Sequence, residues 1–362
     1  MMGRDQTPDQ TPPANEGRRL TVKLMAEKLN VSTATISNAF NRPDQLSEAR
    51  RRWILDECKR LGYMGPNAAA RSLRTGRTGN VGVMLADNLA YSLTDPVASE
   101  FLHGLAEVLD KKRMNMLLLS SQDAGNSYRS HLQESMVDGF IVYGWLTKRD
   151  TYERLLQQGK PMVAVDFDLE GCTWVNIDNY QGARASAEHA LKVPPRNVSI
   201  LGLRLVEQED VCSIRGHDLF GETRAISVRR LNGYLDALGL AGYDISPDRI
   251  WSTPTNNHGD AYQAAYEALS QTPRPDLLLC MSDRLGLAAI QVALQMKLRI
   301  PEDLRIVGFD GIPEGNTLHP SLTTVYQQSA EKGRVAARIF LGEQEDQNVL
   351  IPTRLLVRES CP

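Results

Sequence analysis

The sequence predicts a small all-α head followed by a larger α/β body of two doubly wound parallel-sheet lobes. The chain has 362 residues, 42% hydrophobic and 23% charged, which is enough apolar material for two or three domains of ~100 to 200 residues. From Leu20 to Tyr63 the apolar residues recur with a helical period. Beyond residue 80, short apolar runs alternate with helical stretches, as in parallel sheets that carry helices on both faces.

Composition excludes several classes of protein. The five cysteines are odd in number, scattered and never in a C-x-x-C pair, which argues against a disulfide scaffold, a zinc ribbon and a thioredoxin-like site. The six histidines show no metal-ligand spacing, so we expect neither a metal nor a cofactor. The N-terminal segment lacks the apolar core of a signal peptide, and no apolar run approaches the ~18 residues of a membrane helix. We therefore expect a cytoplasmic protein that does not bind membranes.

The net charge of −3 conceals an asymmetry along the chain. Residues 18–78 hold 13 Lys or Arg against 5 Asp or Glu, a charge of +8, whereas residues 79–362 carry −9. A basic head on an acidic body indicates a nucleic-acid-binding module joined to a second function. An ordinary basic, solvated surface is the alternative.

Residues 18–63 predict a helix-turn-helix domain of three short helices. The first helix is expected at about Val22–Leu29, the turn at Asn30-Val31, and the second helix at about Ser32–Phe40. Ser32 and Ser47 are suited to cap the second and third helices. In a helix-turn-helix the second helix enters the major groove of DNA. An ordinary three-helix packing unit would show the same period.

Two segments flank this domain. Residues 1–17 contain almost nothing to bury and are expected to form a disordered tail. Residues 64–79 pass from a Gly-Pro breaker through a short Ala-rich helix to a Gly/Thr/Arg connector. A helix of about eight residues is not stable alone in water, so its order would depend on a partner. An ordinary Ala-rich linker is the alternative.

The body, residues 80–362, is predicted to contain two lobes because about 280 residues exceed one open sheet. Ligands of such sheets bind beyond the carboxyl ends of the strands. Polar residues follow four of the predicted strands: Asp87, Asp166, Ser282-Asp283 and Asp310. Taken singly, each is more often a helix cap or a solvated loop residue.

The motifs of common α/β enzymes are absent from the sequence. It has no G-x-S-x-G elbow, no G-x-x-x-x-G-K-[ST] phosphate loop, no G-x-G-x-x-G after the first strand and no H-E-x-x-H. We therefore predict that the chain is not an enzyme, although an enzyme acting on a sugar or nucleoside remains an alternative. A secreted solute-binding protein is opposed by the basic head and by the lack of a signal peptide.

Several motifs of the chain are specific in the head and hinge, and weaker ones follow in the body: Val31-Ser32, Thr35-Ile36-Ser37, Leu61-Gly62-Tyr63, Pro66-Asn67-Ala68, Ala70-Arg71-Ser72-Leu73, Ser282-Asp283 and Val307-Gly308-Phe309-Asp310. With these motifs, nearly everything after residue 20 resembles the lactose repressor/galactose repressor (LacI/GalR) family of transcriptional regulators. The resemblance implies a repressor with a helix-turn-helix head, a hinge helix, and a two-lobed body like a periplasmic sugar-binding protein. That body would bind an effector and form a homodimer on operator DNA.

The family's DNA contacts carry over residue by residue. The base-reading positions of the recognition helix hold Thr33, Ala34 and Asn38. The positions that hold phosphates or the helix itself are Ser32, Thr35, Ser37 and Asn41. Leu73 matches the apolar wedge that the hinge inserts into the minor groove. Many members have Arg where this chain has Asn38, and because Asn suits adenine whereas Arg suits guanine, we predict an altered operator preference.

The family's effector-contacting positions also carry over. They hold Asp166, Arg230, Ser282 and Asp310, and carboxylates beside an Arg donor suit the paired hydroxyls of a sugar. The Trp that the family often has near Asn256 is missing, so the identity of the ligand does not transfer. Nucleosides and other small polar metabolites stay open as effectors, as does a protein partner.

Overall fold

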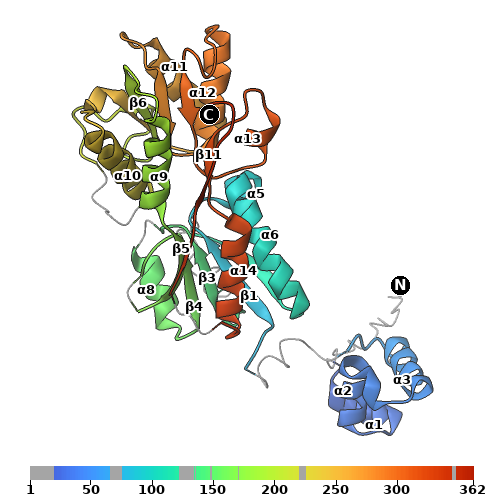
Figure 1. Ribbon diagram of the computed structural model, residues 1–362. Coiled ribbons are helices and arrows are strands. Elements are labelled where there is room, and N and C mark those ends of the chain that lie inside the picture. Colours follow the sequence, from blue (N-terminus) through green and yellow to red (C-terminus); the bar gives the residue numbers. More distant parts are fainter. Residues whose placement is uncertain are drawn as a thin grey trace, which may run out of the picture. The chain divides into compact units, whose positions relative to one another are not determined.

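The computed structural model describes residues 20–65, 76–121, 134, 136–146, 149–169, 171–219, 226–344 and 348–362. The chain divides into two compact units, residues 1–78 and 79–362 (Figure 1). The predicted tail, residues 1–17, and most of the predicted hinge, including Leu73, lie outside the described residues.

The described part of the head contains three α-helices and one short 3-10 helix: α1 (Val22–Leu29), α2 (Thr33–Asn41), η1 (Pro43–Gln45) and α3 (Glu48–Arg60). Each α-helix begins after a hydroxyl side chain that accepts a hydrogen bond from its first turn: Thr21, Ser32 and Ser47. Helix α2 therefore starts one residue later than predicted, because Ser32 serves as its cap. Asn30 ends α1 in the left-handed conformation, with φ 52°.

The core of the head is small and comes from all three helices. Its buried side chains are Met25, Ala26, Ile36, Ala39, Ile54, Cys58 and Tyr63. The Phe40 and Tyr63 rings pack edge to face with their centroids 5.8 Å apart. This core fixes which face of α2 points inward and which remains exposed.

The N-terminal lobe of the body contains a sheet of six parallel strands in the order β12-β5-β4-β3-β1-β2. In chain order these are β1 (Asn80–Leu85), β2 (Asn115–Ser120), β3 (Phe140–Tyr143), β4 (Met162–Val165), β5 (Thr173–Ile177) and β12 (Asn348–Ile351). The described helices of this lobe are α5 (Leu89–Thr94), α6 (Pro96–Lys111), α8 (Arg149–Gln157) and α14 (Ser329–Phe340).

The C-terminal lobe contains a five-stranded sheet in the order β10-β9-β6-β8-β7, with only β7 antiparallel. In chain order these are β6 (Val198–Leu203), β7 (Cys212–Ser213), β8 (Ile250–Thr253), β9 (Leu277–Cys280) and β10 (Arg305–Val307). The described helices here are α9 (Asn179–Ala190), α10 (Ile226–Leu240), η2 (Pro247–Arg249), α11 (His258–Ser270), α12 (Asp283–Gln295) and α13 (Glu314–Thr317).

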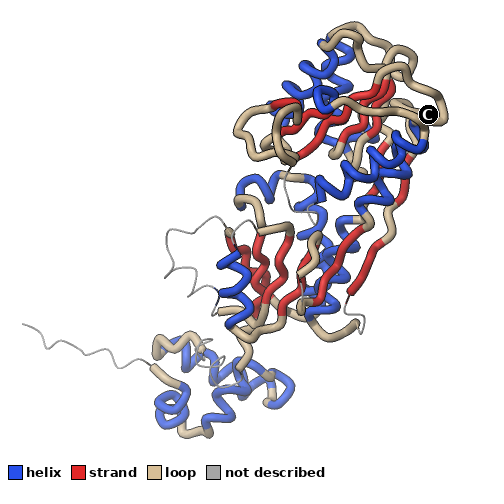
Figure 2. The backbone as a smooth tube through the Cα atoms, turned by 90° about the vertical axis from the view of Figure 1, so that its left-hand side faces the viewer, coloured by secondary structure: helices blue, strands red, loops and turns tan. Residues whose placement is uncertain are grey.

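The prediction of two parallel-sheet lobes is confirmed, with helices on both faces of each sheet (Figure 2). The chain passes between the lobes from β5 to α9, from β10 to α14, and from β12 to the last strand. A two-stranded antiparallel ladder, β11 (Thr324–Tyr326) with β13 (Arg354–Leu356), belongs to the second and third of these passages. No helix in the described ranges is long and apolar enough to cross a membrane.

Helix α14 lies unusually close to α6 in the N-terminal lobe. A Cβ atom added to Gly104 would lie 1.9 Å from the carbonyl oxygen of Ala330, and one added to Gly333 would lie 2.1 Å from that of Phe101. Both positions therefore require glycine, because the two helix backbones lie in direct contact there.

Candidate functional site: an exposed recognition helix and an interlobe polar cluster

Helix α2 has an apolar face in the core and a small, polar face toward solvent. Ile36 and Ala39 are fully buried, whereas Thr33 and Ala34 are exposed and Asn38 is half-buried. The three predicted base-reading residues thus share the outer side of one helix, free of the core. Short side chains on that side let a helix backbone approach the floor of a DNA groove.

The other four predicted residues of α2 are engaged with the helix itself. The Ser32 hydroxyl accepts from the Thr35 backbone N–H at 3.0 Å and lies 2.8 Å from the Thr35 hydroxyl. The Asn41 amide donates to the Ser37 carbonyl oxygen at 3.0 Å. Helix α3 holds the end of α2 as well, because Arg51 Nε donates to the Ala39 carbonyl oxygen at 3.0 Å.

In the body, three of the four predicted effector residues lie where strands of the two lobes end. Asp166 follows β4 in the N-terminal lobe, and Ser282 and Asp310 follow β9 and β10 in the C-terminal lobe. Asp166 and Asp310 both have positive φ, 65° and 132°, so the backbone turns sharply as each strand ends. All three side chains are buried.

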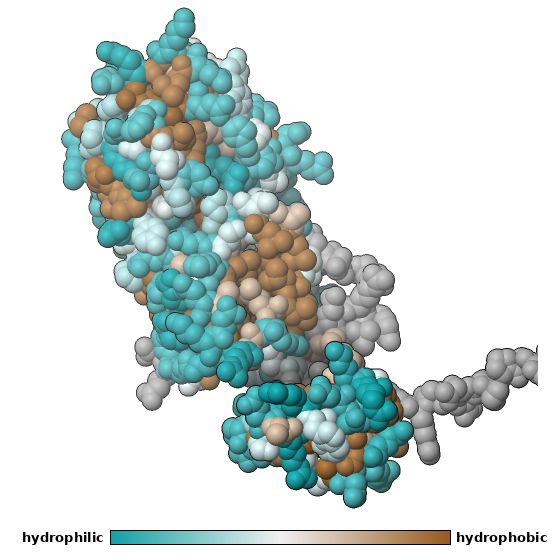
Figure 3. All heavy atoms as spheres, turned by 90° about the vertical axis from the view of Figure 1, so that its right-hand side faces the viewer, coloured by the Kyte–Doolittle hydropathy of each residue, from teal (hydrophilic) through white to brown (hydrophobic). Residues whose placement is uncertain are grey.

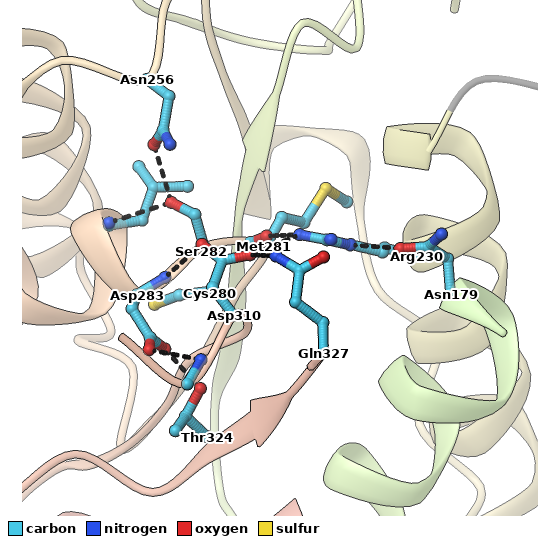
Figure 4. Close-up of polar contacts among 12 residues, drawn as sticks. Asn179, Arg230, Asn256, Cys280, Met281, Ser282, Asp283, Asp310, Thr324 and Gln327 are labelled. Carbon is cyan, nitrogen blue, oxygen red and sulfur yellow. Dashed lines mark hydrogen bonds and ion pairs between the residues drawn. The ribbon is translucent and has the colours of Figure 1, made fainter. Parts of the chain in front are cut away.

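Arg230, on α10, reaches the end of β10 and pairs with Asp310 at 3.3 Å (Figure 4). Its Nε donates to Asn179 at 2.9 Å, its Nη1 also donates to the Met281 carbonyl oxygen, and its guanidinium lies 3.6 Å above the Phe309 ring. A guanidinium with these contacts holds a fixed orientation.

Asp310 and the nearby Asp283 are both buried carboxyl groups. Burial raises the pKa of Asp310 to about 8, although the positive charge of Arg230 opposes that shift. Burial also raises the pKa of Asp283 to about 6, against hydrogen bonds from Thr324 and from the backbone N–H groups of Ile312 and Gly311. Asp283 therefore shapes the loop after β10, and its own backbone N–H donates to Asp310 at 3.3 Å.

Ser282 has a local role beside this pair. Its hydroxyl donates to the Asn256 amide oxygen at 2.8 Å and accepts from the Leu285 backbone N–H as the cap of α12 (Figure 4). It is adjacent to Asp283 in the chain, but among the described residues its side chain bonds to Asn256 and Leu285 and to neither Arg230 nor Asp310.

Sequence reasoning missed two residues that join Asp166 to Asp310. Lys332, fully buried on α14, donates to both Asp166 oxygens at 2.7 and 2.9 Å and to the Gln327 amide oxygen at 2.9 Å. The Gln327 amide nitrogen in turn donates to Asp310 at 2.8 Å. We name the five residues Asp166, Lys332, Gln327, Asp310 and Arg230 the interlobe polar cluster. No local pattern in the sequence distinguishes Lys332 from a solvated helical lysine.

Ion pairs also join the lobes around this cluster. Asp87, after β1, pairs with Arg204, after β6, at 2.7 Å, and Asp95 at the start of α6 lies 3.8 Å from Arg284 on α12. Asp87 thus belongs to a lobe-to-lobe contact rather than to the buried cluster. In the part of the chain that the structure describes, no three His, Cys, Asp or Glu side chains gather as metal ligands would.

Comparison with known proteins finds a matching family model and a similar regulator. The family model of the periplasmic binding protein-like domain matches residues 217–361. An HTH-type transcriptional regulator of Mycolicibacterium smegmatis is 36% identical over 345 residues, which cover 89% of this chain and 90% of that protein.

Solved structures agree with this comparison. The complex of the transcriptional regulator CelR with cellobiose has 25% identity and a TM-score of 0.64, over 94% of this chain and 100% of the other. A LacI-family transcriptional regulator from Corynebacterium glutamicum has 24% identity and a TM-score of 0.65, over 94% and 98% of the two chains.

Proposed function

This chain belongs to the LacI/GalR family of HTH-type transcriptional regulators, and we propose that it is a repressor whose affinity for operator DNA is switched by a sugar bound between its two lobes. It is a regulator and not an enzyme, in line with its relatives. The observation that carries the proposal is the interlobe polar cluster, which spans from the strand ends of one lobe to those of the other.

The head would read the operator with α2 in the major groove. Thr33, Ala34 and Asn38 face solvent together, so they would contact base edges, with Asn38 suited to adenine. Ser32 and Thr35 stand at the N-terminus of α2, where hydroxyls and backbone N–H groups bind phosphate.

The repressor would act as a homodimer. Two-fold symmetry matches a near-palindromic operator, and two hinge helices would together insert Leu73 into the minor groove. The body offers an apolar patch on the side where α6 lies, shown in Figure 3, and Leu93 at the end of α5 is 55% exposed. A partner subunit would remove such a patch from water. Action on operator DNA implies a cytoplasmic protein.

The effector would bind at the interlobe polar cluster and change the angle between the lobes. Asp310 and Arg230 in one lobe and Asp166 in the other offer acceptors and a fixed donor for the hydroxyls of a sugar. Because such a ligand contacts both lobes, it favours one lobe angle over another, and operator DNA must change the affinity for it by the same factor. The solved relative bound to cellobiose supports a saccharide as the class of ligand.

The test is a thermal-shift panel of neutral sugars, sugar phosphates and nucleosides on the full chain. A ligand at ~100 times its Kd adds about 2.7 kcal/mol to the unfolding free energy, roughly 5 to 10 °C in Tm. We expect a sugar to raise Tm and the rise to vanish in Arg230→Met and Asp310→Asn.

A matched control is available in the same lobe. Arg299 pairs with Asp303 at 2.7 Å, but its side chain is 71% exposed. Arg299→Met should therefore keep the full ligand-induced rise in Tm. A sugar response that survives in Arg230→Met, or that disappears equally in Arg299→Met, would overturn the assignment of the effector site.

A further inference from the structure

We propose that the ammonium group of Lys332 occupies the place beside Asp166 where a positively charged group of a ligand would otherwise bind, so that the interlobe site selects an effector without positive charge. The inference rests on the proposed function, because it names the charge class of the ligand at the same site. Its basis is the position of one buried lysine and the carboxylate that it neutralises.

Lys332 has all three of its N–H donors engaged inside the protein. Two contact the Asp166 oxygens at 2.7 and 2.9 Å, and the third contacts Gln327 at 2.9 Å. The side chains of Lys332 and Asp166 are 0% and 5% exposed. In the part of the chain that the structure describes, Lys332 is the single cation within 4.0 Å of Asp166.

The backbone that carries Lys332 packs tightly against α6. Gly333, the next residue, lies against the α6 backbone so closely that a Cβ there would meet Phe101 at 2.1 Å. From this helix the Lys332 side chain extends toward Asp166, with its Nζ atom 5.8 Å from the centroid of the Tyr143 ring. Lys332 thus places its ammonium group at the buried Asp166 carboxylate.

The interlobe polar cluster already holds two cations. Lys332 contacts the Asp166 carboxylate, Arg230 contacts Asp310, and Gln327 joins the two pairs by donating to Asp310 and accepting from Lys332. A ligand ammonium would add a third positive charge beside Lys332 in a buried setting, where like charges repel strongly. Uncharged hydroxyls, in contrast, would donate to the carboxylate lone pairs that Lys332 leaves unused.

Removing the lysine should convert its place into a site for an ammonium ion. Lys332→Ala deletes the atoms of a propylammonium ion and leaves Asp166 as a buried carboxylate with no cation. We expect n-propylammonium to raise the Tm of Lys332→Ala in a saturable manner. n-Propanol should raise it far less, and neither compound should act on the wild-type chain. The matched control is the double variant Asp166→Asn with Lys332→Ala, which has the same cavity without the carboxylate.

A thermal double-mutant cycle keeps the test decisive if Lys332→Ala does not fold. Lys332→Met preserves most of the volume of the stem, and Asp166→Asn preserves the shape of the carboxylate. In the wild-type background Asp166→Asn should lower Tm by on the order of 10 °C, because it leaves the buried ammonium group of Lys332 without its carboxylate partner. In the Lys332→Met background it should raise Tm. Such a change of sign measures coupling between the two charges.

The ligand arm compares D-glucose with D-glucosamine and D-galactose with D-galactosamine on the wild-type chain. No amino sugar should stabilise it more than its neutral parent. The proposal is overturned by an amino sugar that binds better than its parent, by equal propylammonium effects with and without Asp166, or by an Asp166→Asn shift that is the same in both backgrounds. A panel in which every neutral sugar is inert counts against the proposed sugar effector, while the cycle still decides the role of Lys332.

Discussion

Replacing Asp310 by Asn should flatten the dependence of stability on pH. Burial raises the pKa of Asp310 to about 8 in the folded chain, above its ordinary value of 3.8. Between those values the folded state holds a proton that the unfolded state releases, so the free energy of unfolding falls as pH rises. The slope is about 1.4 kcal/mol per pH unit for one group. From pH 6.0 to 7.5 the wild type should thus lose roughly 2 kcal/mol that Asp310→Asn keeps.

The pH window is chosen because Asp283 also titrates. Its pKa is raised to about 6, so its own contribution to the slope is largely complete above that value. Differential scanning calorimetry at pH 6.0 and 7.5 should show the Tm of the wild type falling by about 4 to 8 °C relative to that of Asp310→Asn.

The control for this experiment is an exposed carboxylate with the opposite shift. Hydrogen bonds from Arg299 lower the pKa of Asp303 to about 2, so its contribution is complete above its ordinary pKa of 3.8 and is lost only as the pH falls toward 2. Asp303→Asn should therefore keep the wild-type slope between pH 6.0 and 7.5. Parallel slopes for the wild type and Asp310→Asn would refute the assignment of a buried, proton-binding Asp310.

Three further predictions concern the DNA contacts and the packing of α14. Asn38→Arg should move the preferred operator base from adenine toward guanine by about 1 to 3 kcal/mol, and an unchanged consensus in a binding selection would contradict it. Leu73→Ala should weaken operator binding in an anisotropy titration while leaving effector binding intact, so an operator affinity within twofold of the wild type would exclude the wedge. Gly104→Ala should destabilise the chain by about 1 to 3 kcal/mol in a thermal melt, because its Cβ would meet Ala330; Gly239→Ala, which meets nothing within 4 Å, should not.

Local signals predicted much of the fold from the sequence. Ser32 and Ser47 precede helical patterns, and the structure has both hydroxyls as caps. The apolar runs of the central strands were recognised because strands buried on both faces are continuously hydrophobic. Strands β5, TWVNI, and β8, IWST, give a weaker signal in the sequence, because polar residues interrupt their short apolar patterns.

The site was predictable only in part, because its connections join distant parts of the chain. Asp166 and Asp310 each follow a recognisable strand, and the family resemblance singled them out among the polar residues at strand ends. Lys332 lies 166 residues from its partner Asp166, and a lysine in a helix is most often solvated, so no local pattern identified it. Gln327 was even harder to predict as a site residue, because an amide side chain in a connecting segment has no characteristic environment.

The structure indicates how a ligand bound between the lobes would affect the helix packing of the N-terminal lobe. Asp166 and Asp310 belong to different lobes, and the hydrogen bonds between them run through Gln327 on the crossing segment and Lys332 on α14. Since the glycine contacts hold the backbones of α14 and α6 together, we expect a shift of Asp166 relative to Asp310 to move these two helices as a pair. A ligand that bridges the two carboxyl groups would therefore select between arrangements of a whole lobe, which is the condition for linkage between an effector site and a distant operator contact.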